Sequence, residues 1–192
     1  MKKIITISRQ FGTGGREIGE MVAKRLGIEV YDKYIIEHVA EQSGFEKNLV
    51  QSALQESSPR KYASRRFKIN GMNIDELLYI EEKRIIKDLA SKGPCVFIGR
   101  CSDYILKDEK DVMHVFIYGD LKVRANRVSK GNYEGHENPE KILKEKDNKR
   151  ASNYSHFTGR TWGEPTNYDL MINSSKLTPE ECVDLIIDLY NK

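Results

Sequence analysis

Residues 4–19 read IITISRQFGTGGREIG, and this stretch decides the fold. The run from Ile4 to Ser8 is apolar and β-branched, which favours a buried strand. Glycines follow at positions 12, 14 and 15, where the backbone can take a positive φ and approach a ligand closely. Apolar residues then recur three and four positions apart, which predicts a helix that Gly27 ends. A strand, a glycine-rich turn and a helix in this order predict a phosphate-binding site, because a helix N-terminus offers unpaired N–H groups.

The turn matches the P-loop motif only in part. That motif requires a glycine, four residues, Gly-Lys, and then Ser or Thr. If Gly15 is its last glycine, Arg16 stands in the lysine position and Glu17 replaces the hydroxyl that binds magnesium, while Gln10 replaces the first glycine. An arginine can hold a phosphate bidentately, although its reach differs from that of lysine. The alternative is an ordinary glycine-rich turn. We expect the donor phosphates to be bound by Ser8, Arg9, Gly12, Thr13, Gly14, Gly15, Arg16 and Glu17.

Length and composition indicate one domain and are compatible with a small anionic ligand. The chain has 192 residues, of which 39% are hydrophobic, enough for one packed core with a small inserted segment. The formal net charge is only +3. Binding to duplex nucleic acid usually needs a concentrated basic stripe, so we do not expect a nucleic-acid partner.

We expect no membrane segment and a cytoplasmic location. No apolar run approaches the length of a membrane span, and the opening apolar stretch ends at Arg9, too soon for a secretory signal. The three cysteines have no metal-binding spacing, and their odd number favours reduced thiols.

Strand and helix patterns alternate along the rest of the chain. Capping signals mark four helix starts: Asn73 with Glu76, Asp120, Asn138 before a proline, and Thr178 with Glu181. Residues 150–168 show no periodicity and are predicted to be a loop. Further short apolar runs, typical of buried parallel strands, occur at 28–31, 95–98, 113–117 and 168–172. This alternation predicts an α/β fold of the P-loop NTPase type, with a parallel sheet of about five strands and helices on both faces.

Ligands of such sheets bind at the carboxyl ends of the strands. Those ends carry the chemistry in this sequence: Ser8-Arg9, Asp32, Gly99-Arg100 and Gly119-Asp120. We therefore expect one anion-binding edge.

Four segments resemble the bacterial cytidylate kinase-like proteins, relatives of the nucleoside monophosphate kinases. They are ISRQFGTGGREIG at 7–19, YDK at 31–33, FIGRC at 97–101 and YSHFTGRTWGEPTNYDLMIN at 154–173. The resemblance spans nearly the whole chain. It implies a helical monophosphate-binding insertion at 33–72 and an arginine-bearing lid at 150–168.

The resemblance also implies roles for individual residues. Arg100 would grip the acceptor phosphate and Arg124 would face it, in preference to Arg127 on the same helix. Asp32 and Asp103 are acceptor-side candidates, although each could instead cap a helix. Arg150 and Arg160 of the lid would stabilise the charge of the transferring phosphoryl group, because this chemistry depends on alignment and charge cancellation. Arg16 is a candidate for the same role because of its place in the glycine loop. Magnesium with ATP as donor is the implied cofactor, and no metal-binding residue is assigned.

The leading interpretation is phosphoryl transfer from a nucleoside triphosphate to a nucleoside monophosphate, CMP or another pyrimidine nucleotide. Two alternatives stay open. The departures at positions 16 and 17 fit a nucleotide-binding regulatory protein without kinase activity, and the same fold also serves kinases of other small acceptors. The sequence predicts no oligomeric state.

Overall fold

The computed structural model describes residues 4–43, 68–69, 71–130 and 138–192. Most of the predicted monophosphate-binding insertion, with the basic residues from Arg60 to Arg66, lies outside these ranges. Among the described residues, no helix is long and apolar enough to cross a membrane.

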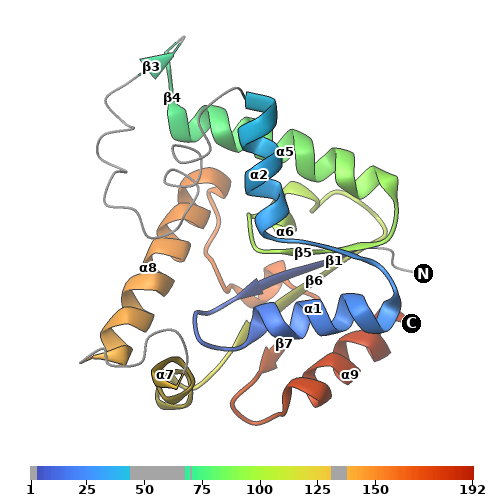
Figure 1. The fold of residues 1–192 in the computed structure, drawn as a ribbon, viewed down its shortest axis with the longest axis vertical. Helices are drawn as coiled ribbons and strands as arrows, with labels where there is room; N and C mark the ends of the chain where they lie inside the picture. The colour runs from blue at the N-terminus through green and yellow to red at the C-terminus, as the bar shows by residue number, and fades with distance from the viewer. Residues whose placement is uncertain (1–3, 44–67, 70, 131–137) are drawn as a thin grey trace.

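One five-stranded parallel sheet organises the chain (Figure 1). Its strands are β1 (Ile4–Arg9), β2 (Glu29–Tyr31), β5 (Cys95–Ile98), β6 (Val112–Tyr118) and β7 (Leu170–Asn173). Their order across the sheet is β2-β5-β1-β6-β7, which places β1 at the centre. A separate two-stranded sheet pairs β3 (Lys68–Ile69) with β4 (Met72–Asn73). The predicted α/β fold with a parallel sheet is confirmed.

Helices cover both faces of the sheet. The helices are α1 (Gly15–Leu26), α2 (Lys33–Ser43), α5 (Ile74–Lys92), α6 (Ser102–Ile105), α7 (Leu121–Ser129), α8 (Pro139–Thr158) and α9 (Pro179–Tyr190), with a 3₁₀ turn η1 (Pro165–Asn167). Figure 1 shows α1 and α9 on one face and α2 with α5 on the other. The α7–α8 pair stands beside the sheet.

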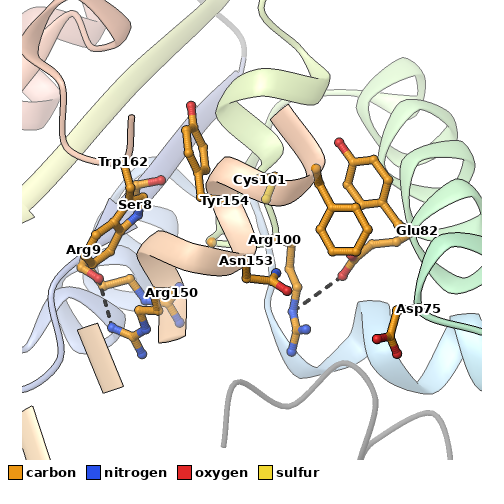
Figure 2. A pocket seen from close by; sticks show the side chains of 13 residues that line it. Ser8, Arg9, Asp75, Glu82, Arg100, Cys101, Arg150, Asn153, Tyr154 and Trp162 are labelled. Atoms are coloured by element: carbon orange, nitrogen blue, oxygen red, sulfur yellow. Dashed lines mark hydrogen bonds and ion pairs between the residues drawn. The ribbon is translucent and has the colours of Figure 1, made fainter. Parts of the chain in front are cut away.

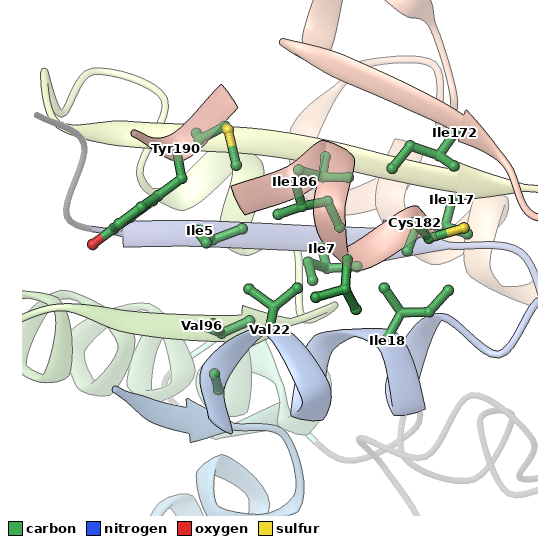
Figure 3. Packing of buried hydrophobic residues seen from close by; sticks show 14 of the residues in the cluster. Ile5, Ile7, Ile18, Val22, Val96, Ile117, Ile172, Cys182, Ile186 and Tyr190 are labelled. Atoms are coloured by element: carbon green, nitrogen blue, oxygen red, sulfur yellow. The ribbon is translucent and has the colours of Figure 1, made fainter. Parts of the chain in front are cut away.

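Successive side chains of each strand point to opposite faces of the sheet, and each face has its own hydrophobic core. Ile5 and Ile7 of β1 pack against α1 and α9, as Figure 3 shows, and both are fully buried. Ile4 of β1 and Phe97 of β5 point to the other face and pack against α2 and α5. Successive side chains of a strand point to opposite faces, so a strand covered on both sides must be apolar throughout.

Three of the predicted helix caps are confirmed by hydrogen bonds, whereas Asp120 is the N-cap of α7 without a side-chain capping hydrogen bond. Asn73 N–H donates to Glu76 Oε2 at 2.9 Å, and Thr178 N–H donates to Glu181 Oε2 at 2.7 Å. Asn138 Oδ1 accepts from the Lys141 amide at 3.0 Å.

The prediction of a loop from Arg150 to Tyr168 is wrong over its first half. Helix α8 continues to Thr158, and Gly159, with φ of 69°, ends it. Serine, asparagine and aromatic residues have modest helix propensity, which hid the helical periodicity of this stretch. The segment between α8 and β7 is therefore 159–169, and it includes η1.

Candidate active site

The glycine loop joins β1 to α1 at the centre of the sheet. Gly12 and Gly14 have φ of 80° and 78°, in the left-handed region, as predicted. Gly14 is the N-cap of α1. Gly15 differs from the prediction, since it is the first helical residue and its φ is not positive. A Cβ at Gly15 would lie 2.8 Å from Arg9 Cβ, so glycine is required there for space.

Thr13 braces the loop from inside. Its hydroxyl donates to the Gln10 carbonyl at 2.9 Å and accepts from the Gly15 amide at 3.2 Å. The amides of Arg16 and Glu17 follow in the first turn of α1, where the helix itself supplies no acceptor. The start of α1 therefore presents donors and the positive end of its dipole to an anion.

Arginines from three elements surround this loop. The Arg9 side chain lies against Gly15, and Arg150 of α8 donates from Nη1 to the Arg9 carbonyl at 2.8 Å. The Arg150 guanidinium also lies 5.5 Å from the centre of the Phe11 ring. Arg127 of α7 donates to the Thr13 carbonyl and covers Gly14.

A pocket opens beside the loop, where β1 and β5 end (Figure 2). Its walls come from the ends of these strands, from α5, from α8 and from the segment after α8. The lining residues are Ser8, Arg9, Asp75, Tyr79, Glu82, Gly99, Arg100, Cys101, Arg150, Asn153, Tyr154, Phe157 and Trp162. The pocket lies at the edge of the sheet where the sequence predicts the ligand, beside β1, which is flanked by β5 and β6.

A left-handed turn after β5 carries Arg100 into the pocket. Gly99, Arg100 and Cys101 have φ of 75°, 63° and 51° in succession. Left-handed backbone costs a non-glycine residue about 1–2 kcal/mol. Arg100 Nε lies 3.6 Å from Glu82 Oε1, and only 15% and 7% of the two side chains are exposed. This carboxylate from α5 holds the guanidinium at the pocket wall (Figure 2).

Asp103 lies beneath the pocket floor. It is 3% exposed, Tyr154 donates a hydrogen bond to its Oδ2 at 2.7 Å, and Ser8 Oγ lies 3.4 Å from its Oδ1. Burial raises the pKa of Asp103, and burial together with the Asp103 charge raises the pKa of the Tyr154 phenol. Asp103 therefore joins β1, α6 and α8. It does not line the pocket itself but contacts Ser8 and Tyr154, which do.

Aromatic side chains form the outer walls. Tyr79 stacks on Phe157 with ring centres 4.3 Å apart and an interplanar angle of 17°. The Tyr79 hydroxyl is buried without a hydrogen-bond partner among the described residues. Trp162 packs edge-on against Phe116, with ring centres 5.2 Å apart. These rings offer flat apolar surfaces on which a planar ligand can stack.

The structure brings only some of the predicted site residues together. Ser8, Arg9, Arg100 and Arg150 line the pocket. Arg16 and Asp32 pair with each other instead, with Nη2 and Oδ2 2.6 Å apart. Arg160 is exposed, lies 5.3 Å from the centre of the Tyr104 ring, and donates to Asn167 Oδ1 at 3.2 Å.

The Arg124 side chain does not line the pocket and is held inside the fold. It is buried, with Nε donating to the Gly119 carbonyl at 2.9 Å and Nη1 donating to Asp147 Oδ2 at 2.6 Å. Nη1 also donates to the Phe11 carbonyl at 2.9 Å, while the Phe11 amide donates to Asp147 Oδ1 at 2.7 Å. This clamp fixes the glycine loop to α7 and α8. Of the two arginines weighed on α7, Arg127 is the one that covers the loop.

Two helix faces in the pocket were missed from the sequence. Asp75, Tyr79 and Glu82 of α5 are spaced four and three apart, so they share one face. Arg150, Asn153, Tyr154 and Phe157 of α8 repeat the same spacing. The sequence pattern does not reveal the second face, because the last turns of α8 are rich in residues of modest helix propensity.

Few of the described side chains are placed to bind a magnesium ion. No group of three or more His, Cys, Asp or Glu side chains within the described ranges is placed to hold a metal ion. Thr13 uses its hydroxyl inside the loop, and the Asp32 carboxylate pairs with Arg16. The described side chains therefore do not assemble a metal cage of their own.

Comparison with known proteins gives one family and a consistent fold. The model of the cytidylate kinase-like family matches residues 4–176. A cytidylate kinase from Pyrococcus horikoshii is 26% identical over 182 residues, covering 93% of this chain and 83% of that protein. One from Methanobrevibacter smithii is 25% identical over 185 residues, covering 96% of each.

Solved structures agree on the fold. An uncharacterized protein from Eubacterium ventriosum superposes with a TM-score of 0.76 at 23% identity, covering 98% of both chains. Shikimate kinase from Bacteroides thetaiotaomicron does so with a TM-score of 0.60 at 14% identity over the full length of both. The family model covers most of the chain, and the protein belongs to the cytidylate kinase-like family.

Proposed function

We propose that this member of the cytidylate kinase-like family is a nucleoside monophosphate kinase, which transfers the terminal phosphoryl group of ATP to CMP or another pyrimidine nucleotide. One observation carries the proposal. Arg9, Arg100 and Arg150, from β1, the turn after β5, and α8, line a single pocket beside a glycine loop. Phosphoryl transfer between two anionic reactants needs this convergence of cations, because alignment and charge cancellation supply most of the catalysis.

The donor is proposed to bind along the loop from Ser8 to Glu17. The left-handed glycines allow close approach, and the start of α1 offers amides and a positive dipole. Arg16 is exposed at this end, and we propose that it leaves Asp32 to meet the donor phosphates. Magnesium would arrive with the triphosphate, since Mg²⁺ usually keeps several waters and takes phosphate oxygens as ligands.

The acceptor is proposed to bind between Arg100 and the α5 face. Arg100 meets the monophosphate, and Asp103 shapes the floor through Ser8 and Tyr154. Tyr79 and Phe157 offer a surface for stacking the base. Asp75 and Glu82 place carboxylates on the same side, and a carboxylate can accept from the amino group of cytosine, which uracil lacks. This chemistry favours CMP over UMP.

Residues 159–169 are proposed as a lid over the bound nucleotides. Trp162 of this segment already lines the pocket, while Arg160 lies against Tyr104 and would have to move to reach the phosphates. Slower amide exchange across 159–169 on binding of a bisubstrate analogue supports this role, and unchanged exchange contradicts it. We further propose a cytoplasmic location, where both nucleotides are present.

The test is an assay of ADP formation with ATP, magnesium and a panel of CMP, dCMP, UMP, AMP and GMP. We expect turnover with at least one monophosphate and the best efficiency with a cytidine nucleotide. Arg25→Met removes an exposed arginine paired with Asp184 and should leave turnover unchanged. ATP binding without turnover on any acceptor would favour a regulatory protein, and turnover only on a non-nucleotide would favour a kinase of another small acceptor.

A further inference from the structure

We infer that Arg9 does the work of the missing P-loop lysine, and that Gly15 is a glycine because the stem of the Arg9 side chain occupies the space beside it. This inference rests on the proposed function and names the residue that holds the donor phosphates.

Compared with the P-loop motif, the first glycine and the cationic residue of this loop have exchanged positions, at 9 and 15. A residue must be glycine at the end of the loop because its backbone is left-handed, and Gly14 has that conformation while Gly15 is already helical. With Gly14 as the last glycine, the motif places lysine at position 15 and the first glycine at position 9. The chain has a glycine where the lysine belongs and an arginine where the glycine belongs.

The side-chain geometry matches this exchange. A Cβ at Gly15 would lie 2.8 Å from Arg9 Cβ and 3.0 Å from Arg9 Cγ. The stem of Arg9 thus fills the direction in which a side chain at position 15 would leave the backbone. A Cβ at Gly99 would overlap Arg9 Nη1, so the guanidinium passes over the end of β5.

The backbone of Arg9 is also held in place. It is the last residue of the central strand, where it stands beside Ile117 of β6. Its carbonyl accepts from Arg150 Nη1 at 2.8 Å. The cation therefore projects from a fixed backbone into a pocket that Arg100 and Arg150 share (Figure 2). A guanidinium can meet two phosphate oxygens at once, which suits it to the β- and γ-phosphates that the lysine normally contacts.

Four variants separate charge from packing: Arg9→Met, Arg9→Gly, Gly15→Lys, and Arg9→Gly with Gly15→Lys. The readouts are the dissociation constant for ATP by calorimetry and the melting temperature without ligand. Arg9→Met keeps an unbranched stem and removes the cation. We expect it to weaken ATP binding by about tenfold to hundredfold, the range for one hydrogen-bonded charged contact, with little change in melting temperature.

The double variant tests the exchange itself. Gly15→Lys alone should lower the melting temperature, because the new side chain meets the Arg9 stem. Combined with Arg9→Gly it should recover both melting temperature and ATP affinity relative to the two single variants, a non-additive result expected only of residues that share a space.

Two results would overturn the inference. One is wild-type ATP affinity in Arg9→Met. The other is purely additive effects of the changes at positions 9 and 15. Either result, obtained with a wild-type protein that binds ATP and turns over, leaves the proposed function standing. A wild-type protein that binds no nucleoside triphosphate contradicts both.

Discussion

Arg100 and Glu82 face each other inside the pocket, with Nε and Oε1 3.6 Å apart and both side chains largely buried. The pair joins the turn after β5 to α5, and it puts a cation at the proposed site of the acceptor phosphate. A buried carboxylate that loses its cation is destabilising. Removing Arg100 should therefore change both the affinity for the monophosphate and the free energy of unfolding.

Replacing Arg100 by alanine should therefore have two separable effects. We expect the KM for the monophosphate to rise about tenfold to hundredfold, with a much smaller change for ATP, because one charged contact is lost at the acceptor. Unfolding in urea should show a loss of about 1–3 kcal/mol. Adding Glu82→Gln should restore much of the stability and none of the acceptor affinity. Equal effects on both substrates would count against this assignment.

The glycine loop has a matched control elsewhere in the chain. Gly14 and Gly27 both have left-handed backbone, with φ of 78° and 65°, and they bound the two ends of α1. Alanine at either position should cost about 1–2 kcal/mol of conformational strain, and at Gly14 it would also displace the Arg127 guanidinium. Only Gly14→Ala should weaken ATP binding, because Gly27 has open space around it and lies at the far end of the helix. Calorimetry with ATP checks this, and equal affinities for the two variants would remove the loop from the donor site.

The clamp formed by Arg124 and Asp147 should act on stability. Only 8% and 14% of the two side chains are exposed, and both also hold the Phe11 backbone. Arg124→Met should reduce the free energy of unfolding by about 3–5 kcal/mol, because a buried carboxylate is left without its cation. Asp147→Asn should be destabilising for the converse reason. A normally stable Arg124→Met protein with a strongly raised monophosphate KM would restore the acceptor role predicted from the sequence.

Asp103 should make stability fall as pH rises. Burial raises its folded pKa above the unfolded value, so between these two values the folded state binds more protons than the unfolded state. The contribution of Asp103 is thus most favourable below about pH 4, the ordinary aspartate pKa, and declines as pH rises toward the folded pKa. The difference in unfolding free energy between wild type and Asp103→Asn, measured from pH 3.5 to 7, should shift in favour of the variant. A flat or opposite difference curve would show that the carboxylate is well accommodated as an anion.

Local patterns predicted the sheet and the helix starts, because they depend on residues close in sequence. Apolar runs mark strands covered on both faces, and Thr178 with Glu181 is a cap whatever the rest of the chain does. The edge that carries the pocket also followed, since parallel strands bring their carboxyl ends together.

The features of the site that the sequence did not predict depend on contacts between distant segments. Arg124 and Arg127 lie three apart on one helix, and contacts with distant segments distinguish them. Asp147, 23 residues after Arg124, pairs with the buried arginine, while Arg127 lies over the glycine loop. Gly15 looked like a residue chosen for its backbone, whereas the Arg9 stem is the reason for it. Such roles come from tertiary packing, which one sequence does not display.

Transfer of label from [γ-³²P]ATP to CMP, in the presence of magnesium, tests the central claim most directly. The account predicts labelled CDP that forms only when both nucleotides are present, at a rate that Arg25→Met leaves unchanged and that Arg100→Ala lowers sharply at limiting CMP. Label that remains in ATP or appears only as inorganic phosphate, across CMP and the other monophosphates, would contradict it.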